Sequence, residues 1–125
     1  MTNSNDTSKA FQYAISLCDK WRHEFVTPEH VLYAIAEQEP FVEAASTAEL
    51  DAPALQEELR PELTKMEQVP EGVSYTIEGS EQFSEMMAHA VKQAQFAESD
   101  ELDIPHIISA MMELKESLAA YCLHL

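Results

Sequence analysis

The chain has 125 residues, of which 46% are hydrophobic, and its 7 basic and 23 acidic side chains give a formal net charge of −16. This length and hydrophobic content are enough for one domain with a real core. Nucleic acid is disfavoured as a partner because phosphate binding needs basic clusters, so neutral or basic partners are expected. No apolar run approaches the roughly 18 residues of a membrane span, and the first residues lack the order of a signal peptide. We therefore expect a cytoplasmic protein with no membrane contact.

The cysteine and glycine content points to a helical protein from a reducing compartment. Cys18 and Cys122 each lie inside an apolar helical pattern, so we predict reduced core residues, not a disulfide or a zinc pair. The only glycines are Gly72 and Gly79, while Ala, Glu, Leu and Met recur along the chain. This composition predicts an all-α fold.

The first half of the chain begins with signals for two helices. Thr27, Pro28 and Glu29 have the order of a helix start, namely a capping oxygen, a proline and an early acid, and predict a helix from Pro28 to about Gln38. An earlier helix is marked by apolar residues at the spacing of one helical face, which are Phe11, Ala14, Ile15, Cys18 and Trp21.

Two further helices are expected before the middle of the chain. The Glu39–Pro40 pair should end the second helix, and a short helix should follow from Phe41 to about Thr47. Asp51 is the expected cap of a fourth helix, which Pro61 should kink or end. The apolar stripe of this fourth helix is Leu55, Leu59 and Leu63.

Residues 66–79 combine a proline, both glycines and a strand-like segment at 73–77, which predicts an ordered or partly mobile connector. Ser80 is expected to cap a long helix, Asp103 the next one, and a last helix should begin at about Lys115. The apolar residues that mark these three helices are Phe83, Met86, Met87, Ala90, Val91, Ala94, Ile107, Ile108, Met111, Leu118, Tyr121 and Cys122.

The two halves of the sequence match when one is shifted by 76 positions without a gap. The matching pairs include Ala14 with Ala90, Ile15 with Val91, Val26 with Leu102, Thr27 with Asp103, His30 with His106, Val31 with Ile107, Leu32 with Ile108, Ala34 with Ala110, Ile35 with Met111 and Glu37 with Glu113. A duplicated unit is the simplest explanation, with one repeat at about 8–65, the connector at 66–79 and a second repeat at about 80–125. Two units are too few for a solenoid, so we expect two pseudo-repeats of about seven helices, packed face to face as one domain over residues 1–125.

The repeat also suggests a role for two histidines. His30 and His106 each lie three residues after a predicted cap, Thr27 and Asp103 respectively. At that position a side chain can bond back to the cap's backbone N–H, as Glu or Gln does in a capping box. A structural role for these four residues is favoured over catalysis or metal binding.

His23 lies in the turn next to Glu24 and has no histidine counterpart. Zinc could use His23, His30 and a carboxylate, so a small metal-dependent enzyme remains an unfavoured alternative, because no spacing has the strictness of a two-histidine metal motif. Catalysis by Cys18 with a histidine is disfavoured because this thiol should be buried. No catalytic residue is assigned, and without a phosphate-binding glycine loop no cofactor is expected.

Two other groups of residues have both a structural and a binding interpretation. Glu24 and Glu29 flank one turn, either as a solvated acid and a helix-dipole acid or as an acidic docking site, and the residues alone leave both open. The methionine pairs at 86–87 and 111–112 favour core packing, with an apolar groove for unfolded peptide as the alternative. Met87 and Met112 are the candidates for that groove.

The segment RHEFVTPEHVLYAIAEQ resembles the amino-terminal domain of Clp/Hsp100 AAA+ unfoldases, and is closest to the ClpA type. The segments SEQFSEMMAHAVKQAQ and ESLAAYCLHL resemble helices of that domain's second repeat, so the resemblance extends from about Asp6 to Leu125. It implies a mobile, non-catalytic accessory domain on a hexameric ATP-driven unfoldase that feeds protein substrates to the ClpP peptidase. In ClpA-like proteins this domain docks the ClpS adaptor.

The same resemblance implies an adaptor-binding site. The family's adaptor-contacting glutamates match Glu24 and Glu29, Ser80 lies near that contact, and His23 matches a histidine that resembles a reported metal-binding position. The isolated domain is expected to be a monomer because the ATPase rings hold such hexamers together. The chain departs from the family in two respects: it stops before a second-repeat counterpart of the 51–63 helix, and it lacks nucleotide-binding motifs, so any ATPase activity belongs to a larger protein.

Overall fold

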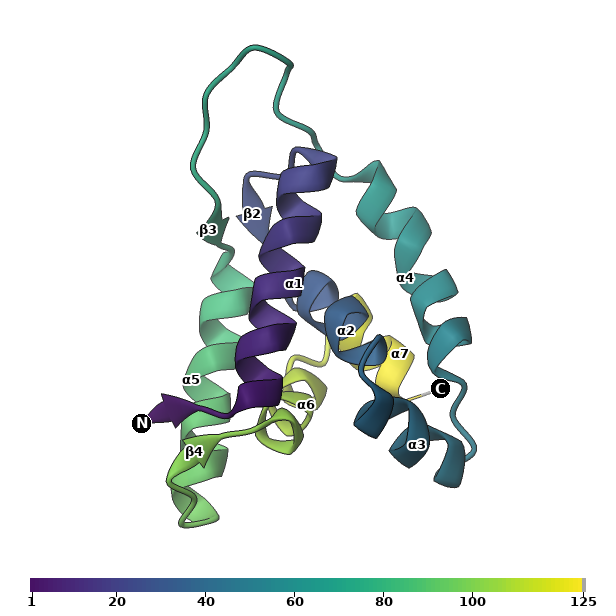
Figure 1. Ribbon diagram of the computed structural model, residues 1–125, viewed down its shortest axis with the longest axis vertical. Coiled ribbons are helices and arrows are strands. Elements are labelled where there is room, and N and C mark those ends of the chain that lie inside the picture. Colours follow the sequence, from purple (N-terminus) through teal and green to yellow (C-terminus); the bar gives the residue numbers. More distant parts are fainter. Residues whose placement is uncertain (125) are drawn as a thin grey trace.

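The computed structural model describes residues 1–124, which form seven helices and four two-residue strands (Figure 1). The all-α fold and the number of helices agree with the sequence prediction. In chain order the elements are β1 (Thr2–Asn3), α1 (Asn5–Trp21), β2 (Phe25–Val26), α2 (Pro28–Ala36), α3 (Glu39–Thr47), α4 (Ala52–Lys65), β3 (Glu78–Gly79), α5 (Glu81–Phe96), β4 (Glu101–Leu102), α6 (Ile104–Glu113) and α7 (Leu118–Leu123). No helix among residues 1–124 is long and apolar enough to cross a membrane.

Side-chain caps begin most of the helices, because the first turn of a helix has backbone N–H groups without partners inside the helix. The sequence predicted four of these caps correctly, and they are Thr27 for α2, Asp51 for α4, Ser80 for α5 and Asp103 for α6. Thr27 with His30 and Asp103 with His106 form the two predicted capping boxes. Ser4 and Ser117 cap α1 and α7, because their side chains accept the backbone N–H groups of Thr7 and Ala120.

Three predicted boundaries differ from the structure. Helix α3 begins at Glu39 and not at Phe41, because Pro40 lies in the first turn, where its missing N–H costs no hydrogen bond. Helix α4 does not end at Pro61 but continues to Lys65, and the burial of Leu59 and Leu63 on either side of the proline offsets the lost hydrogen bond. Helix α7 begins at 118, three residues later than expected.

The four short strands form two parallel pairs, which the sequence did not predict. Strand β1 pairs with β4, and β2 pairs with β3. Thr2 lies opposite Glu101, and Phe25 lies opposite Glu78. The two pairings are equivalent under the repeat offset of 76, which relates Thr2 to Glu78 and Phe25 to Glu101. The first strand of each half therefore pairs with the second strand of the other half, and the two pairs lie at opposite ends of α1 and α5 (Figure 1).

Helix α2 lies at the centre of the core, where every residue from His30 to Ala36 is buried. Helices α1 and α4 both pack against α2, and α5 packs mainly against α6. Both cysteines are free and buried in this core, as predicted. Burial raises the pKa of the Cys18 thiol to about 12, so it stays protonated and unreactive at neutral pH.

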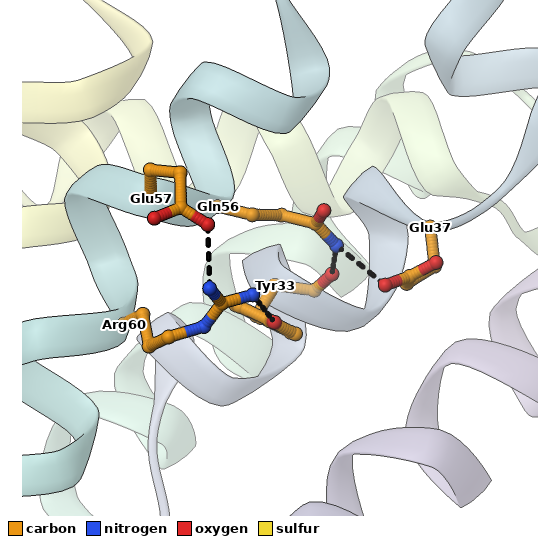
Figure 2. A network of polar contacts seen from close by, with 5 residues as sticks. All are labelled: Tyr33, Glu37, Gln56, Glu57 and Arg60. Carbon is orange, nitrogen blue, oxygen red and sulfur yellow. Dashed lines mark hydrogen bonds and ion pairs between the residues drawn. The ribbon is translucent and has the colours of Figure 1, made fainter.

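Polar contacts as well as apolar ones hold α4 on α2 (Figure 2). The Gln56 amide donates to the Tyr33 carbonyl oxygen over 3.2 Å and to a Glu37 carboxylate oxygen over 3.0 Å. The Arg60 guanidinium donates to the Tyr33 hydroxyl over 2.8 Å and also pairs with Glu57. These contacts fix the lateral position of α4 on α2.

The connector at 66–79 is attached to the end of α1 by Arg22. The Arg22 Nε donates to the Val69 carbonyl oxygen over 2.7 Å, and the Val69 N–H donates back to the Arg22 carbonyl over 2.7 Å. The guanidinium also lies over the Tyr75 ring, 5.4 Å from its centroid. Of the two alternatives left open by the sequence, these contacts favour an ordered connector.

Gly79 offers a test of how the second strand pair is packed. A Cβ added there would lie 2.6 Å from Cδ1 of Phe83, whose ring packs edge-on against Phe11 at 6.0 Å between centroids. We predict that Gly79→Ala lowers the free energy of unfolding by about 1–2 kcal/mol because the Phe83 ring has to move. In a Phe83→Ala background the same change should cost at least about 0.5 kcal/mol less, measured by urea unfolding as a double-mutant cycle. Equal costs in the two backgrounds would contradict this packing.

Candidate docking surface

The pairing of β2 with β3 places Glu24 at the surface beside the start of the second half. The Glu78 N–H donates to the Glu24 carbonyl oxygen over 2.9 Å, and the Ser80 N–H donates to the Val26 carbonyl oxygen over 2.9 Å. The Glu24 side chain is exposed. The structure thus brings together the segments of Glu24 and Ser80, two of the predicted adaptor-binding residues.

A surface hollow of about 400 Å³ opens between this turn and the connector. Its apolar lining includes Phe25, which is 44% exposed, and Val73, which is 51% exposed. Glu24 and Glu67 supply carboxylates at the same hollow. An apolar surface with acidic neighbours suits a partner that brings apolar and basic side chains. We call this region the β2–connector hollow.

Phe25 and Val73 were not predicted from the sequence to lie at the surface. The available signal was the alternation of a strand, in which Phe25 points outward where its neighbour Val26 is buried. A two-residue strand is too short to produce a periodic pattern, and Val73 comes close to Phe25 only through the fold.

Ser80 has a structural role in this arrangement. Its Oγ accepts the N–H of Phe83 over 3.1 Å and so caps α5. The side chain is half-buried, and its backbone belongs to the β2–β3 junction. Ser80 therefore supports the surface next to Glu24.

Glu29 makes an internal contact that neither interpretation of the sequence included. Its Oε2 accepts the backbone N–H of Ala119 over 2.9 Å, in the first turn of α7. A carboxylate at the N-terminus of a helix satisfies an unpaired N–H and opposes the positive end of the helix dipole. Glu29 therefore joins α2 to the start of α7, in addition to lying in the first turn of its own helix.

His23 lies inside the protein and is fully buried, so its side chain does not present a surface to a partner. Its Nδ1 lies 2.9 Å from the Nε2 of His30. The Thr27 N–H donates to the Nδ1 of His30 over 3.0 Å, so the proton of the neutral His30 ring is on Nε2. That proton is donated to His23, which leaves the His23 proton on Nε2. In the part of the chain that is described, this atom has no partner.

This pair explains the protonation of both rings. Burial, and in addition the nearby His23, lower the pKa of His30 to about 4. Burial also lowers the pKa of His23. Both rings are therefore neutral near pH 7. The hydrogen bonds require this, because the Nδ1 of His30 accepts the Thr27 N–H and the Nδ1 of His23 accepts the proton of His30.

The histidines do not form a metal centre with Glu24. The facing nitrogens of His23 and His30 are used by their mutual hydrogen bond, and both rings are buried while Glu24 is exposed. Residues 1–124 contain no group of three or more His, Cys, Asp or Glu side chains that could hold a metal ion. The arrangement gives no support to the metal-dependent enzyme.

One methionine of each pair is less buried than its neighbour, as expected. Met86 and Met111 are completely buried, while Met87 and Met112 are half-buried. Met87 packs against the core. Neither belongs to the large apolar side chains that are strongly exposed, so the proposed peptide groove at these two residues remains untested.

We predict that Glu29 and Glu24 differ in their effect on folding. Glu29→Ala should lower the free energy of unfolding by about 1 kcal/mol because it leaves the Ala119 N–H without its carboxylate. Glu24→Ala, which removes an exposed carboxylate with no side-chain hydrogen bond among residues 1–124, should change it by less than about 0.5 kcal/mol. Urea unfolding of both variants measures the difference. Equal losses would mean that the contact with α7 does not contribute.

We also predict that the histidine pair makes the domain sensitive to acid. The pKa of His30 is lower in the folded protein than its ordinary value of 6.5, so the unfolded chain binds more protons below that pH. The stability from neutral His30 is fully present above about pH 6.5 and is lost as the pH falls toward about 4, by about 2–3 kcal/mol.

The measurement is urea unfolding at a series of pH values, with His30→Gln as the comparison. Gln cannot titrate but can still bond back to the Thr27 N–H. The variant should therefore lose less stability than the native protein between neutral and acidic pH. Identical pH profiles would contradict the assignment.

Comparison with known proteins places this fold in a family. Residues 2–125 match the model of the Clp repeat (R) N-terminal domain. A comparison with curated proteins gives no match. Among solved structures, the N-terminal domain of Hsp104 from Candida albicans aligns with a TM-score of 0.84 and 16% identity, over 99% of this chain and 81% of that one.

Two other solved structures are similar to the same extent. The N-terminal domain of the ClpV1 ATPase from E. coli aligns with a TM-score of 0.81 and 21% identity, over 98% of this chain and 77% of that one. A chain from structural work on a malarial protein secretion system aligns with a TM-score of 0.85 and 19% identity, over 99% and 84%. At these identities the likeness establishes the fold. With the family match over nearly its whole length, the chain belongs to the Clp N-terminal domain family, the non-catalytic domains of Hsp100 ATPases that generally bind substrates or adaptors.

Proposed function

We propose that this domain docks a ClpS-type adaptor on the β2–connector hollow and so delivers protein substrates to a Clp unfoldase. The proposal includes a larger cytoplasmic protein that carries the ATPase modules and works with the ClpP peptidase. The domain itself would bind and position its partner, while the energy for unfolding would come from ATP hydrolysis elsewhere in that protein.

The observation that carries the proposal is the exposed Glu24–Phe25 pair at the start of strand β2, which is fixed from both sides. Strand β2 is hydrogen-bonded to β3, and the residues after it begin α2 through the Thr27 cap. A rigid strand presents its side chains to a partner without first having to be ordered, which reduces the entropic cost of binding. Phe25 offers an aromatic anchor and Glu24 offers a charge beside it.

Electrostatics favour a basic partner at this hollow. The chain has a formal net charge of −16, and Glu24 and Glu67 place carboxylates at the opening. Such a field speeds the encounter with a basic surface and makes the affinity sensitive to salt. The residues that line the hollow include two acids, Glu24 and Glu67, and no Lys or Arg.

The proposal assigns different roles to the residues that the sequence singled out. Glu24 contacts the adaptor, together with Phe25 and Val73. His23 and Ser80 act behind the surface, by holding the start of α2 and the β2–β3 junction. Glu29 also acts as a support, because its carboxylate is bonded to α7.

Calorimetric titration with a ClpS-type adaptor tests this assignment. We expect the native domain to bind, and Glu24→Lys to weaken binding by about tenfold or more, because it puts a positive charge against a basic surface. The matched control is Glu43→Lys, which makes the same charge change at an exposed position on α3 and should weaken binding only by about twofold through the change in net charge. Raising the salt from about 50 to about 500 mM should weaken native binding several-fold.

Two results would contradict the proposal. Equal losses for Glu24→Lys and Glu43→Lys would mean that the adaptor senses only the total charge. Failure of the folded native domain to bind would remove this adaptor class, and the exposed pair would then be left without a known partner.

A further inference from the structure

The connector forms one wall of the β2–connector hollow and is not held there by the core. Residues 66–70 and Val73 of the connector line the hollow opposite the turn that carries Glu24 and Phe25. No residue in the range 66–80 is buried, and the two that pack against the core, Met66 and Ile77, are at the ends of the connector. In Figure 1 the connector is a loop that extends away from the helices, between α4 and β3. Its middle part therefore needs other contacts to stay in place.

Polar contacts from the end of α1 supply this attachment. The Gln68 amide donates to the Trp21 carbonyl oxygen over 3.0 Å, and the Val69 N–H donates to the Arg22 carbonyl oxygen over 2.7 Å. In return the Nε of Arg22 donates to the Val69 carbonyl oxygen. The last carbonyl groups of a helix have no partner inside the helix, so the connector satisfies two of them while they fix its path.

The Arg22 guanidinium also holds the turn that follows Val69. The Val73 N–H donates to the Pro70 carbonyl oxygen over 3.2 Å, and Gly72 has a φ of 80°, as the third residue of a type II turn requires. The Nη2 of Arg22 donates to the Pro70 carbonyl oxygen over 2.5 Å and to that of Val73 over 3.5 Å. One planar guanidinium thus reaches carbonyl groups of three connector residues, which a single ammonium group cannot do.

The fold of α1 does not account for an arginine at this position. Arg22 is the C-cap of α1 in the left-handed conformation, with φ 56° and ψ 45°. Its counterpart Glu98 adopts the same conformation with an acidic side chain, so the backbone does not require arginine. Arg22 makes no ion pair among residues 1–124, although the chain has 23 acidic residues. The hydrogen bonds of its side chain all go to the connector.

We propose that Arg22 is the positioning residue of the β2–connector hollow, because it holds the connector in the conformation that forms one wall. Arg22 does not line the hollow itself, so it acts through the connector. The inference rests on the proposed function, since it takes this hollow as the docking site. A wall that is ordered in advance spares the partner the cost of ordering it, and only domains with the wall in place bind.

Amide hydrogen exchange in the isolated domain tests the attachment without any partner. Arg22→Lys keeps the positive charge and the backbone conformation but leaves one ammonium group in place of the guanidinium. We expect the N–H groups of Val69 and Val73 to exchange at least about tenfold faster in this variant, as followed by NMR. The N–H of Val31, a buried residue of α2, should change by less than about twofold, because the helices stay folded.

Arg60→Lys is the matched control, at the only other arginine of the chain. Arg60 contacts Tyr33 and Glu57 and makes no hydrogen bond to the connector in the part of the chain that is described. This variant should leave the exchange of the Val69 and Val73 N–H groups unchanged within about twofold.

Calorimetric titration with a ClpS-type adaptor then tests the effect on docking. Arg22→Lys should weaken binding by about fivefold, because a smaller fraction of the domain has the wall in place. Arg60→Lys should weaken it by less than about twofold. Both variants keep the net charge, so a difference between them does not come from the overall field.

Four outcomes decide the proposal. Unchanged exchange of Val69 and Val73 in Arg22→Lys would overturn it, and so would an equal acceleration at Val31, which would mean that Arg22 holds the whole domain together. Faster exchange in the connector with unchanged adaptor affinity would overturn the role of this wall in docking. If the native domain does not bind the adaptor, the proposed function fails, while the exchange experiment still decides whether Arg22 positions the connector.

Discussion

The crossed pairing of four short strands is the constraint on which the rest of the domain depends. Each pair joins the start of one half to the middle of the other through backbone hydrogen bonds, so neither half can move without breaking bonds at both ends of α1 and α5. The buried cap Ser4 extends this connection, because its hydroxyl donates to Asp103, the cap of α6. The caps of α1 and α6 are therefore also a point where the two halves meet. A two-residue strand contributes little stability alone, but here the position of each strand pair orients two helices.

Local signals made much of the fold predictable from the sequence. A cap such as Thr27 or Asp103 acts within three residues of itself, and the leucine stripe of α4 repeats within one helix, so both leave patterns that can be seen without the structure. The repeat offset then related the two capping boxes, Thr27 with His30 and Asp103 with His106. By contrast, the bonds from Glu78 to Glu24 and from Ala119 to Glu29 join positions far apart in the chain, and no periodicity records them. For this reason the strands and the contact of Glu29 with α7 were missed.

The two halves have diverged in the side chains that they place at equivalent positions. Thr7 stands at the position equivalent to Phe83, and Asn3 stands at the position equivalent to Gly79, so the second half gives up a side chain on its strand to make room for an aromatic ring in the core. Likewise His23 corresponds to Ser99, and only the first half has a histidine against its capping histidine. Substitutions of this kind leave the backbone scheme unchanged, since Arg22 and its counterpart Glu98 both adopt the left-handed conformation.

The same divergence extends to burial. In the first half α2 is apolar on nearly all sides, and every residue from His30 to Ala36 is buried. Among the described residues, its counterpart α6 buries Ile107, Ala110 and Met111. Helix α2 contacts helices of both halves, because α1, α3 and α4 as well as α5, α6 and α7 pack against it. The first half therefore supplies the centre of the core, around which the second half packs, and this arrangement makes α2 apolar on more sides than α6.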